Sequence, residues 1–178
     1  MSWSTFLPIP TVRHLLAEDC ALISQAFTLQ GWKKPVQQYE NYWQEALAGK
    51  REILVAEIES TFAGYLTIVW VSDYAPFSHK GIPEIVDLNV LKKYQGRGIA
   101  TTLLDAAERQ IAKRSPIAGI GVGLTADYGP AQVLYIKRGY VPDGRGVFSH
   151  GQSIVYGNLV PMDDDLVLYL TKRLGNIE

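Results

Sequence analysis

The segment 84–112 constrains the fold of this chain more than any other part of the sequence. It opens with EIVDLNV, an apolar and β-branched run typical of a strand. A turn with Gly96 and Gly98 follows. The next residues repeat with helical spacing and give one apolar face, formed by Ile99, Leu103, Ala107 and Ile111. A strand joined to an amphipathic helix by a glycine-rich turn predicts a fold that contains both strands and helices.

The rest of the chain supplies more elements of both kinds. Strands are predicted at 11–16, 51–58, 62–71, 84–90, 117–126, 147–157 and 165–173. Helices are predicted at 17–27 and 38–50, from Ile99 to the break at Ser115 and Pro116, and at 130–139. The helices interleave with the strands but do not alternate strictly with them. This order favours a mixed α/β (α+β) sheet over a doubly wound parallel one. No internal repeat or long linker interrupts the chain, so one domain covering residues 1–178 is expected.

Composition excludes several classes of function. The 17 basic and 18 acidic residues nearly balance, and no strongly basic patch favours a nucleic-acid partner. No run of about 18 apolar residues occurs, so no membrane span is expected. The N-terminal stretch 1–15 lacks the basic start and long apolar run of a signal peptide, which favours a cytoplasmic protein. The single cysteine, Cys20, and three dispersed histidines give no disulfide framework and no metal-ligand spacing.

The turn at Gln95–Ala100 has the chemistry of an anion-binding cradle. Glycine permits backbone angles forbidden to other residues and lets a ligand approach closely. A helix start carries roughly half a positive charge and leaves about four N–H groups unpaired. No lysine follows as in a P-loop, and Thr101 fills the last position of the dinucleotide pattern G-x-G-x-x-G. The segment therefore predicts a phosphate or pyrophosphate site, with a plain strand-to-helix connection as the alternative.

Two motifs together resemble a known family. LNV, four residues and then Q-x-x-G-x-A resemble motif A of the GNAT superfamily of acyl-CoA-dependent N-acyltransferases. AQVLYIKRGY at 131–140 resembles the A-x-x-L-Y-x-K-x-G-[FY] element of the same family, in the family's order and at about its distance. The resemblance implies a central, mostly antiparallel sheet with a splayed pair of parallel strands, flanked by helices. It does not identify a subfamily.

The resemblance also implies acetyl-CoA as co-substrate, without a metal, and a cofactor site made mostly of main chain. Its residues would be Leu88, Asn89, Val90, Gln95, Gly96, Arg97, Gly98, Ile99, Ala100 and Thr101. Backbone N–H groups of Gln95–Thr101 would hold the pyrophosphate. The strand would splay at a bulge, and free backbone groups of Leu88 and Val90 would pair with the pantetheine amides as if with a neighbouring strand. The sequence departs from the family at Tyr128, where many members carry an asparagine that contacts the cofactor.

Tyr135 is the candidate general acid, because it matches the family tyrosine. A phenol with a pKa of about 10 stays protonated at neutral pH and can donate to the departing thiolate. The alternative is a tyrosine that only packs in the core. Cys20 lies far in sequence from both motifs and is expected to be a core residue, which argues against a covalent acyl-enzyme.

Glu84 is the candidate base that removes a proton from the attacking amine, through a water, as in one branch of the family. Asp87 is its rival, and water is the third alternative. The two carboxylates are three residues apart and would face opposite sides of a regular strand. Weaker candidates are His79 near the cleft, Trp32 as a wall of the acceptor pocket and the acidic run 162–165 as an attractor of cations.

The expected function is direct acetyl transfer from acetyl-CoA to a primary amine in a ternary complex. A non-catalytic acyl-CoA sensor of the same fold is the alternative, and a nucleotide-binding module is a third interpretation. The acceptor stays open between a polyamine, an amino acid, an antibiotic amine, a peptide N-terminus and a lysine side chain. The sequence also leaves open a longer acyl donor and a homodimer.

Overall fold

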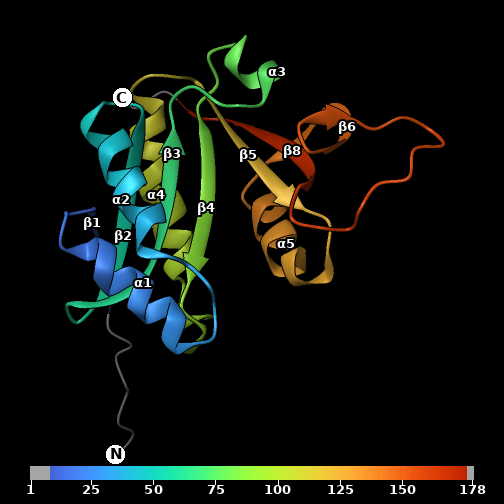
Figure 1. Ribbon diagram of the computed structural model, residues 1–178. Coiled ribbons are helices and arrows are strands. Elements are labelled where there is room, and N and C mark those ends of the chain that lie inside the picture. The colour runs from blue at the N-terminus through green and yellow to red at the C-terminus, as the bar shows by residue number, and fades with distance from the viewer. Residues whose placement is uncertain (1–8, 176–178) are drawn as a thin grey trace, which may run out of the picture. The chain divides into compact units, whose positions relative to one another are not determined.

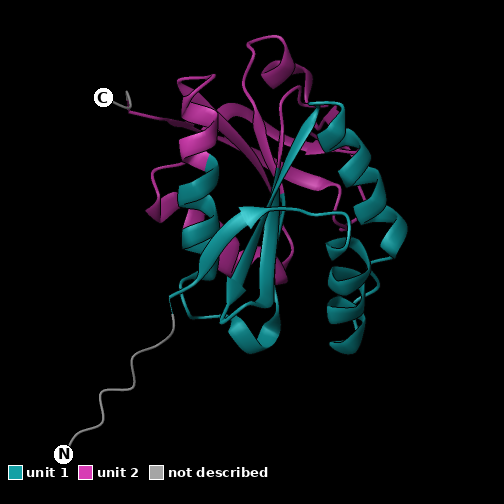
Figure 2. Ribbon diagram, turned by 90° about the vertical axis from the view of Figure 1, so that its left-hand side faces the viewer, with its two compact units in different colours: residues 1–67, 87–107 teal, residues 68–86, 108–178 magenta. Residues whose placement is uncertain are grey.

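The computed structural model describes residues 9–175 (Figure 1). The chain forms two compact units, each built from two segments that are separated in sequence (Figure 2). The first unit contains the residues up to Thr67 and Asp87–Ala107; the second contains Ile68–Val86 and the residues from Glu108 onward. Most of the N-terminal stretch on which the signal-peptide expectation depends, Met1–Pro8, lies outside the described residues. The single-domain expectation stays a prediction.

The first unit is a layer of strands with helices on both faces. Its strand order is β1-β2-β3-β4, with bounds β1 Thr11–His14, β2 Arg51–Ile58, β3 Thr61–Val69 and β4 Glu84–Val90. Helices α1 (Asp19–Leu29) and α2 (Val36–Leu47) cover one face, and the first part of α4 (Ile99–Ala112) covers the other (Figures 1 and 2). Glu59 and Ser60 join β2 to β3 with φ of 48° and 60°, the left-handed angles that a two-residue hairpin turn requires.

The core of the first unit lies between the strands and helices α1 and α2. Its buried residues are Leu15, Cys20, Ile23, Phe27, Tyr39, Ile53, Val55, Tyr65 and Leu91. The rings of Phe27 and Tyr65 meet edge to face with centroids 5.8 Å apart. Burial of apolar area of this kind is the main force that holds the two helices against the strands.

The second unit contains the other end of the strand order, β4-β5-β8-β6-β7. Its further strands are β5 (Ile117–Gly123), β6 (Val141–Ser149), β7 (Gln152–Ser153) and β8 (Leu166–Arg173). Strands β4 and β5 are parallel, with Glu84 opposite Gly119 and Ile85 opposite Ile120, whereas β5, β8, β6 and β7 pair antiparallel. The predicted class, an open mixed α/β sheet flanked by helices, is confirmed.

The second unit contains the end of α4 from Glu108 onward, the short α3 (Ala75–Ser78) and α5 (Gly129–Lys137). No helix was predicted where α3 lies, because one turn of helix gives too few residues for a periodic pattern. Across residues 9–175, every helix is too short or too polar to traverse a lipid bilayer.

One strand prediction was wrong. The segment 147–157 was expected to be a single strand, but β6 begins at Val141, and a turn at His150 and Gly151 separates it from β7. Their φ angles of 50° and 75° reverse the chain there. The early start of β6 was not predicted, because Gly144 and Gly146 disrupt the strand pattern in the sequence. The structure has an irregular register between Pro142 and Val147 in the same place.

Candidate active site

The turn between β4 and α4 has an uncommon backbone conformation. Gly96 and Gly98 have φ of 73° and 78° and flank Arg97. A Cβ atom built at either glycine would meet nothing within 4 Å, so the backbone angle, and not lack of space, requires glycine. Left-handed residues that alternate with ordinary ones turn successive N–H groups to one side, which makes a concavity suited to anions.

The N–H groups of this turn are available for a ligand. Within residues 9–175, no oxygen accepts a hydrogen bond from the N–H groups of Gly96 to Thr101. The next N–H, of Thr102, donates to the Gly98 carbonyl at 2.9 Å. The unpaired donors stand at the positive end of the α4 dipole, where a phosphate group is stabilised.

Three cationic side chains gather beside the turn. The Lys93 ammonium lies 4.8 Å from the centre of the Tyr94 ring, and the Arg97 guanidinium lies 5.7 Å from the same ring. The Lys92 ammonium lies 5.6 Å from the Trp32 ring. Their charges add to the field of the helix start and favour a ligand with several negative charges, such as a diphosphate.

The end of β4, residues 88–90, is joined to this turn. The side-chain amide of Gln95 donates to the Val90 carbonyl at 3.3 Å. On the neighbouring β3, a Cβ at Gly64 would stand 2.6 Å from the Asn89 carbonyl oxygen, so only glycine permits this close approach. The ten residues predicted to hold the coenzyme all lie in the first unit, at the end of β4, in the turn and at the start of α4.

Asp87, directly before these residues, is the centre of a dense polar cluster. Its φ of 59° lies in the left-handed region, which is uncommon for a residue other than glycine. Oδ1 accepts hydrogen bonds from Lys34 Nζ at 3.0 Å and from Asn89 Nδ2 at 2.6 Å. Oδ2 accepts them from Gln38 at 3.0 Å, Tyr42 at 3.0 Å and Tyr65 at 2.6 Å. We call these six residues the Asp87 cluster.

The environment of Asp87 keeps it ionised. Burial by itself would raise the pKa of its carboxyl, but the Lys34 ammonium and the hydrogen bonds from Tyr65, Lys34 and Tyr42 outweigh burial and lower the pKa. A carboxylate with a lowered pKa and donors on both oxygens is a weak proton acceptor. Asp87 is therefore poorly suited to the role of general base.

Glu84 opens β4 in the second unit. Its Oε2 accepts a hydrogen bond from the buried Ser72 hydroxyl at 2.5 Å. A Cβ at Gly121 would stand 3.5 Å from Glu84 Oε1. Burial, followed by the negative charge of Glu84, raises the pKa of Tyr169 to about 12. The expected opposite facing of Glu84 and Asp87 assumed a regular strand, and the left-handed conformation at Asp87 breaks that regularity.

Tyr135 lies in α5 and is buried, with 6 % of its surface exposed. Burial, with a smaller contribution from Tyr128, raises the pKa of its phenol above the usual value. In the described part of the chain, no side-chain hydrogen bond is found for the Tyr135 hydroxyl. The phenol is thus protonated at neutral pH and has its proton available for a ligand.

Tyr128, at the position of the family asparagine, packs on β5. A Cβ at Gly123 would stand 2.6 Å from its ring, so the glycine makes room for the tyrosine. The Tyr128 hydroxyl donates to Asp164 at 3.2 Å. The side chain therefore has a packing role in the second unit that a smaller asparagine would not fill.

Two weaker candidates are explained by packing. Cys20 is buried in the first core, and burial raises the pKa of its thiol, which keeps it protonated and unreactive. Trp32 stacks on Phe27 with ring centres 5.6 Å apart and an interplanar angle of 3°. Trp32 is partly buried and packs against the core of the first unit.

The acidic run 162–165 forms a grouping that sequence spacing did not predict. His150 Nε2 lies 3.7 Å from an Asp163 oxygen and 3.4 Å from an Asp165 oxygen. The three side chains come together because the turn after β6 and the segment before β8 are neighbours, with the His150 N–H donating to the Asp165 carbonyl. The His150 and Asp165 side chains are exposed and that of Asp163 is partly buried, and the imidazole forms an ion pair with them only when it is protonated.

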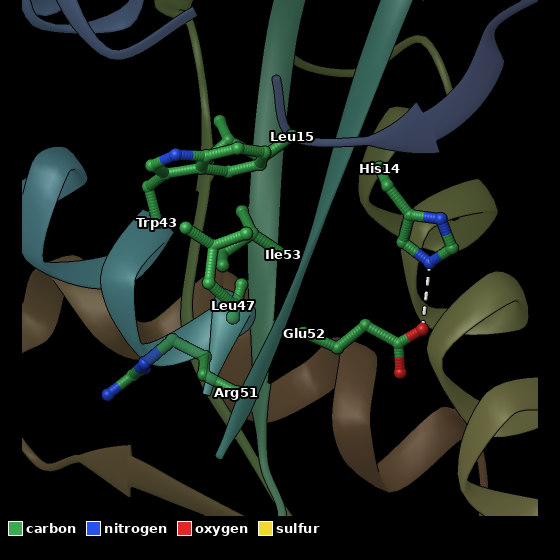
Figure 3. A pocket seen from close by; sticks show the side chains of 8 residues that line it. His14, Leu15, Trp43, Leu47, Arg51, Glu52 and Ile53 are labelled. Carbon is green, nitrogen blue, oxygen red and sulfur yellow. Dashed lines mark hydrogen bonds and ion pairs between the residues drawn. The ribbon is translucent and has the colours of Figure 1, made fainter. Parts of the chain in front are cut away.

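A pocket of about 220 Å³ opens in the first unit between α2 and β2 (Figure 3). Its lining is formed by His14, Leu15, Trp43, Ala46, Leu47, Arg51, Glu52 and Ile53. His14 bonds to Glu52 at 2.7 Å, and Arg51 donates to Thr67 at 2.7 Å and to Glu45. None of the residues predicted to hold the coenzyme lines this pocket, so it is not the expected coenzyme site.

Comparison with known families gives one match that covers most of the chain. The family described as Acetyltransferase (GNAT) family matches residues 14–140. No curated protein sequence matches the chain.

Solved structures share the fold at low sequence identity. The yncA protein from Salmonella typhimurium, solved with its cofactor acetyl-CoA, is 16% identical with a TM-score of 0.66, and the match covers 93% of this chain and 94% of that one. Ribosomal-protein-S18-alanine N-acetyltransferase from Escherichia coli is 12% identical with a TM-score of 0.67 and coverage of 96% and 97%. Spermidine/spermine N-acetyltransferase SpeG from Vibrio cholerae is 17% identical with a TM-score of 0.64 and coverage of 93% and 92%.

Proposed function

Because the chain belongs to the GNAT acetyltransferase family, we propose that it transfers the acetyl group of acetyl-CoA directly to a primary amine in a ternary complex. The observation that carries this proposal is the turn at Gly96–Thr101, with unpaired N–H groups at a helix start and cations beside it. That chemistry fits the diphosphate of coenzyme A. The turn fits coenzyme A better than an acyl donor without charge, because the diphosphate of coenzyme A carries the negative charge that the turn would bind.

The strand β4 would supply the second half of the coenzyme site. In this proposal the backbone groups of Leu88 and Val90 pair with the pantetheine amides, as a neighbouring strand would. Support comes from Asp87, whose left-handed conformation makes the strand irregular directly before these residues, and from the hydrogen bond that Gln95 donates to Val90. An N–H group of this stretch would also polarise the acetyl carbonyl.

Two side chains would handle the protons. Glu84 would take a proton from the ammonium group through a water, so that the amine nitrogen can attack the carbonyl carbon. As the carbon–nitrogen bond forms and the carbon–sulfur bond breaks, Tyr135 would give its phenol proton to the sulfur. The raised pKa of Tyr135 supports a protonated donor. The buried thiol of Cys20 makes a covalent acyl-enzyme unattractive.

The acceptor is proposed only as a primary amine. Two structures of similar fold are named for acetyl transfer to amines of different size: spermidine or spermine in one, and the alanine of a ribosomal protein in the other. The pocket walls that select between such acceptors vary among proteins of one fold. The family and the turn thus support the donor more directly than the acceptor.

Release of free thiol from acetyl-CoA, measured with a panel of amines, tests the proposed function. We expect at least one polyamine, amino acid ester or lysine-containing peptide to accelerate thiol release over the rate without amine. The acetylated product should appear in equal amount by mass spectrometry. Binding of coenzyme A with no acceleration by any amine would instead support the non-catalytic sensor.

A further inference from the structure

We propose that Asp87, paired with Lys34, is a positioning residue that fixes the coenzyme-binding edge of β4, residues Leu88–Val90. This inference rests on the proposed function, because it assigns a task to the strand that would receive the pantetheine arm. Neither residue would touch the reacting atoms. The pair would act through the backbone that it holds in place.

The first step of the argument is the connectivity of the Asp87 cluster. Its donors come from four places in the first unit: the α1–α2 connection (Lys34), α2 (Gln38 and Tyr42), β3 (Tyr65) and β4 itself (Asn89). The Asp87 carboxylate therefore links β4 to α2, to the α1–α2 connection and to the neighbouring strand β3. Five donors define the position of a carboxylate more tightly than one ion pair does.

The second step is the backbone. Asp87 has φ of 59°, and an isolated strand residue does not adopt this angle without support. A left-handed residue in a strand changes the direction in which the next residues present their N–H and C=O groups. The residues affected are Leu88–Val90. Asn89 is also tied back to the Asp87 carboxylate at 2.6 Å, so the cluster holds the strand on both sides of Leu88.

The third step is the countercharge. The Asp87 and Lys34 side chains are each 18% exposed, so the ion pair is largely shielded from water. The Lys34 ammonium also lies 5.7 Å from the Phe27 ring and 5.8 Å from the Tyr65 ring and donates to the Tyr65 hydroxyl at 3.3 Å. A carboxylate in such surroundings needs its cation. Loss of Lys34 should therefore release the strand even though Asp87 remains.

The rival interpretation is an ion pair that stabilises the fold and has no influence on the coenzyme. The chain offers a control in the same unit, because Arg13, 34% exposed, pairs with the buried Asp19 at 2.6 Å and with Glu57 at 2.7 Å, away from β4. Arg13→Met should lower the unfolding temperature and leave the affinity for coenzyme A unchanged.

The experiment compares wild-type protein with Lys34→Met, Asp87→Asn, the double variant and Arg13→Met. Calorimetry gives the Kd of coenzyme A, and amide hydrogen exchange of the coenzyme-free proteins reports on Leu88–Val90. We expect each single cluster variant to raise Kd about tenfold and to speed exchange at these residues. The double variant should lose less binding free energy than the two single variants lose together, because both act on one ion pair. The kcat at saturating acetyl-CoA should stay within about threefold of wild type, because an interaction made equally in ground and transition states changes KM and not kcat.

Three outcomes would overturn the inference. The first is a Kd and an exchange rate at Leu88–Val90 equal to those of wild type. The second is a cluster variant that changes Kd no more than Arg13→Met does, when both variants lower the unfolding temperature equally. The third is a fall in kcat with Kd unchanged. If Asp87→Asn does not fold, Lys34→Met alone decides.

Failure of the proposed function has a different signature. A non-catalytic sensor would bind coenzyme A without amine-dependent thiol release, and the comparison of Kd values would still apply. If wild-type protein did not bind coenzyme A at all, the exchange measurement on coenzyme-free protein would still show whether the Asp87 cluster fixes residues 88–90. Unchanged exchange in Lys34→Met would overturn the positioning inference in that case too.

Discussion

Replacement of Tyr135 by phenylalanine is expected to lower kcat about 100-fold, the lower range of what a general acid contributes, while coenzyme affinity stays the same. The ring would still fill its buried position in α5, so only the proton donor is lost. The thiolate would then leave without protonation. Steady-state kinetics by thiol release and calorimetry with coenzyme A measure the two quantities separately.

Tyr140→Phe is the matched control for this variant. Tyr140 is fully buried in the same unit, and its ring centre lies 6.1 Å from that of Tyr135. Removal of this second phenol should leave kcat within about threefold of wild type, since no proton transfer is assigned to it. Equal losses in both variants would indicate damaged packing, and an unchanged kcat in Tyr135→Phe would remove Tyr135 from the mechanism.

Gly98→Ala is expected to raise the Kd of coenzyme A about tenfold. A residue with a Cβ pays roughly 1–2 kcal/mol for the left-handed conformation, and 1.4 kcal/mol corresponds to a factor of ten in affinity. The free protein can relax the turn, but coenzyme binding would force it back to a φ of 78°. Surroundings are open at this position, so the methyl group adds no clash. Calorimetric titration with coenzyme A measures the change.

Gly49→Ala separates this effect from loss of stability. Gly49 follows α2 with a φ of 69° and has equally open surroundings, yet it is not part of the predicted coenzyme site. Gly49→Ala should lose unfolding free energy without losing affinity, whereas Gly98→Ala should lose affinity. An affinity loss of the same size in Gly49→Ala would contradict a specific role for the turn.

The features that could be predicted from sequence are those set by local chemistry. Strands 51–58 and 84–90 have the predicted bounds because β-branched runs end there at turn residues. The left-handed turn at Gly96 and Gly98 before α4 was predictable, because glycine spacing before an amphipathic helix is a local pattern. The resemblance to the GNAT superfamily, carried by LNV with Q-x-x-G-x-A and by AQVLYIKRGY, is confirmed by the family match over residues 14–140.

The features that could not be predicted depend on partners distant in sequence. Asp87 looked like a rival base, because nothing nearby in sequence shows that Lys34, Gln38, Tyr42 and Tyr65 would converge on it. Its left-handed φ was equally invisible, since the flanking residues read as a regular strand. The break of 147–157 at His150 was missed because apolar residues on both sides of a turn resemble one strand.

Hydrogen exchange of the Gly96–Thr101 amides, with and without acetyl-CoA, tests the central claim most directly. That claim is that main-chain N–H groups at the start of α4 bind the diphosphate of the donor. We predict that saturating acetyl-CoA slows exchange at these amides, and that Gly98→Ala shifts the protection to higher ligand concentration. Exchange in this turn that stays the same while acetyl-CoA is bound, or a protein that binds no acetyl-CoA, would contradict it.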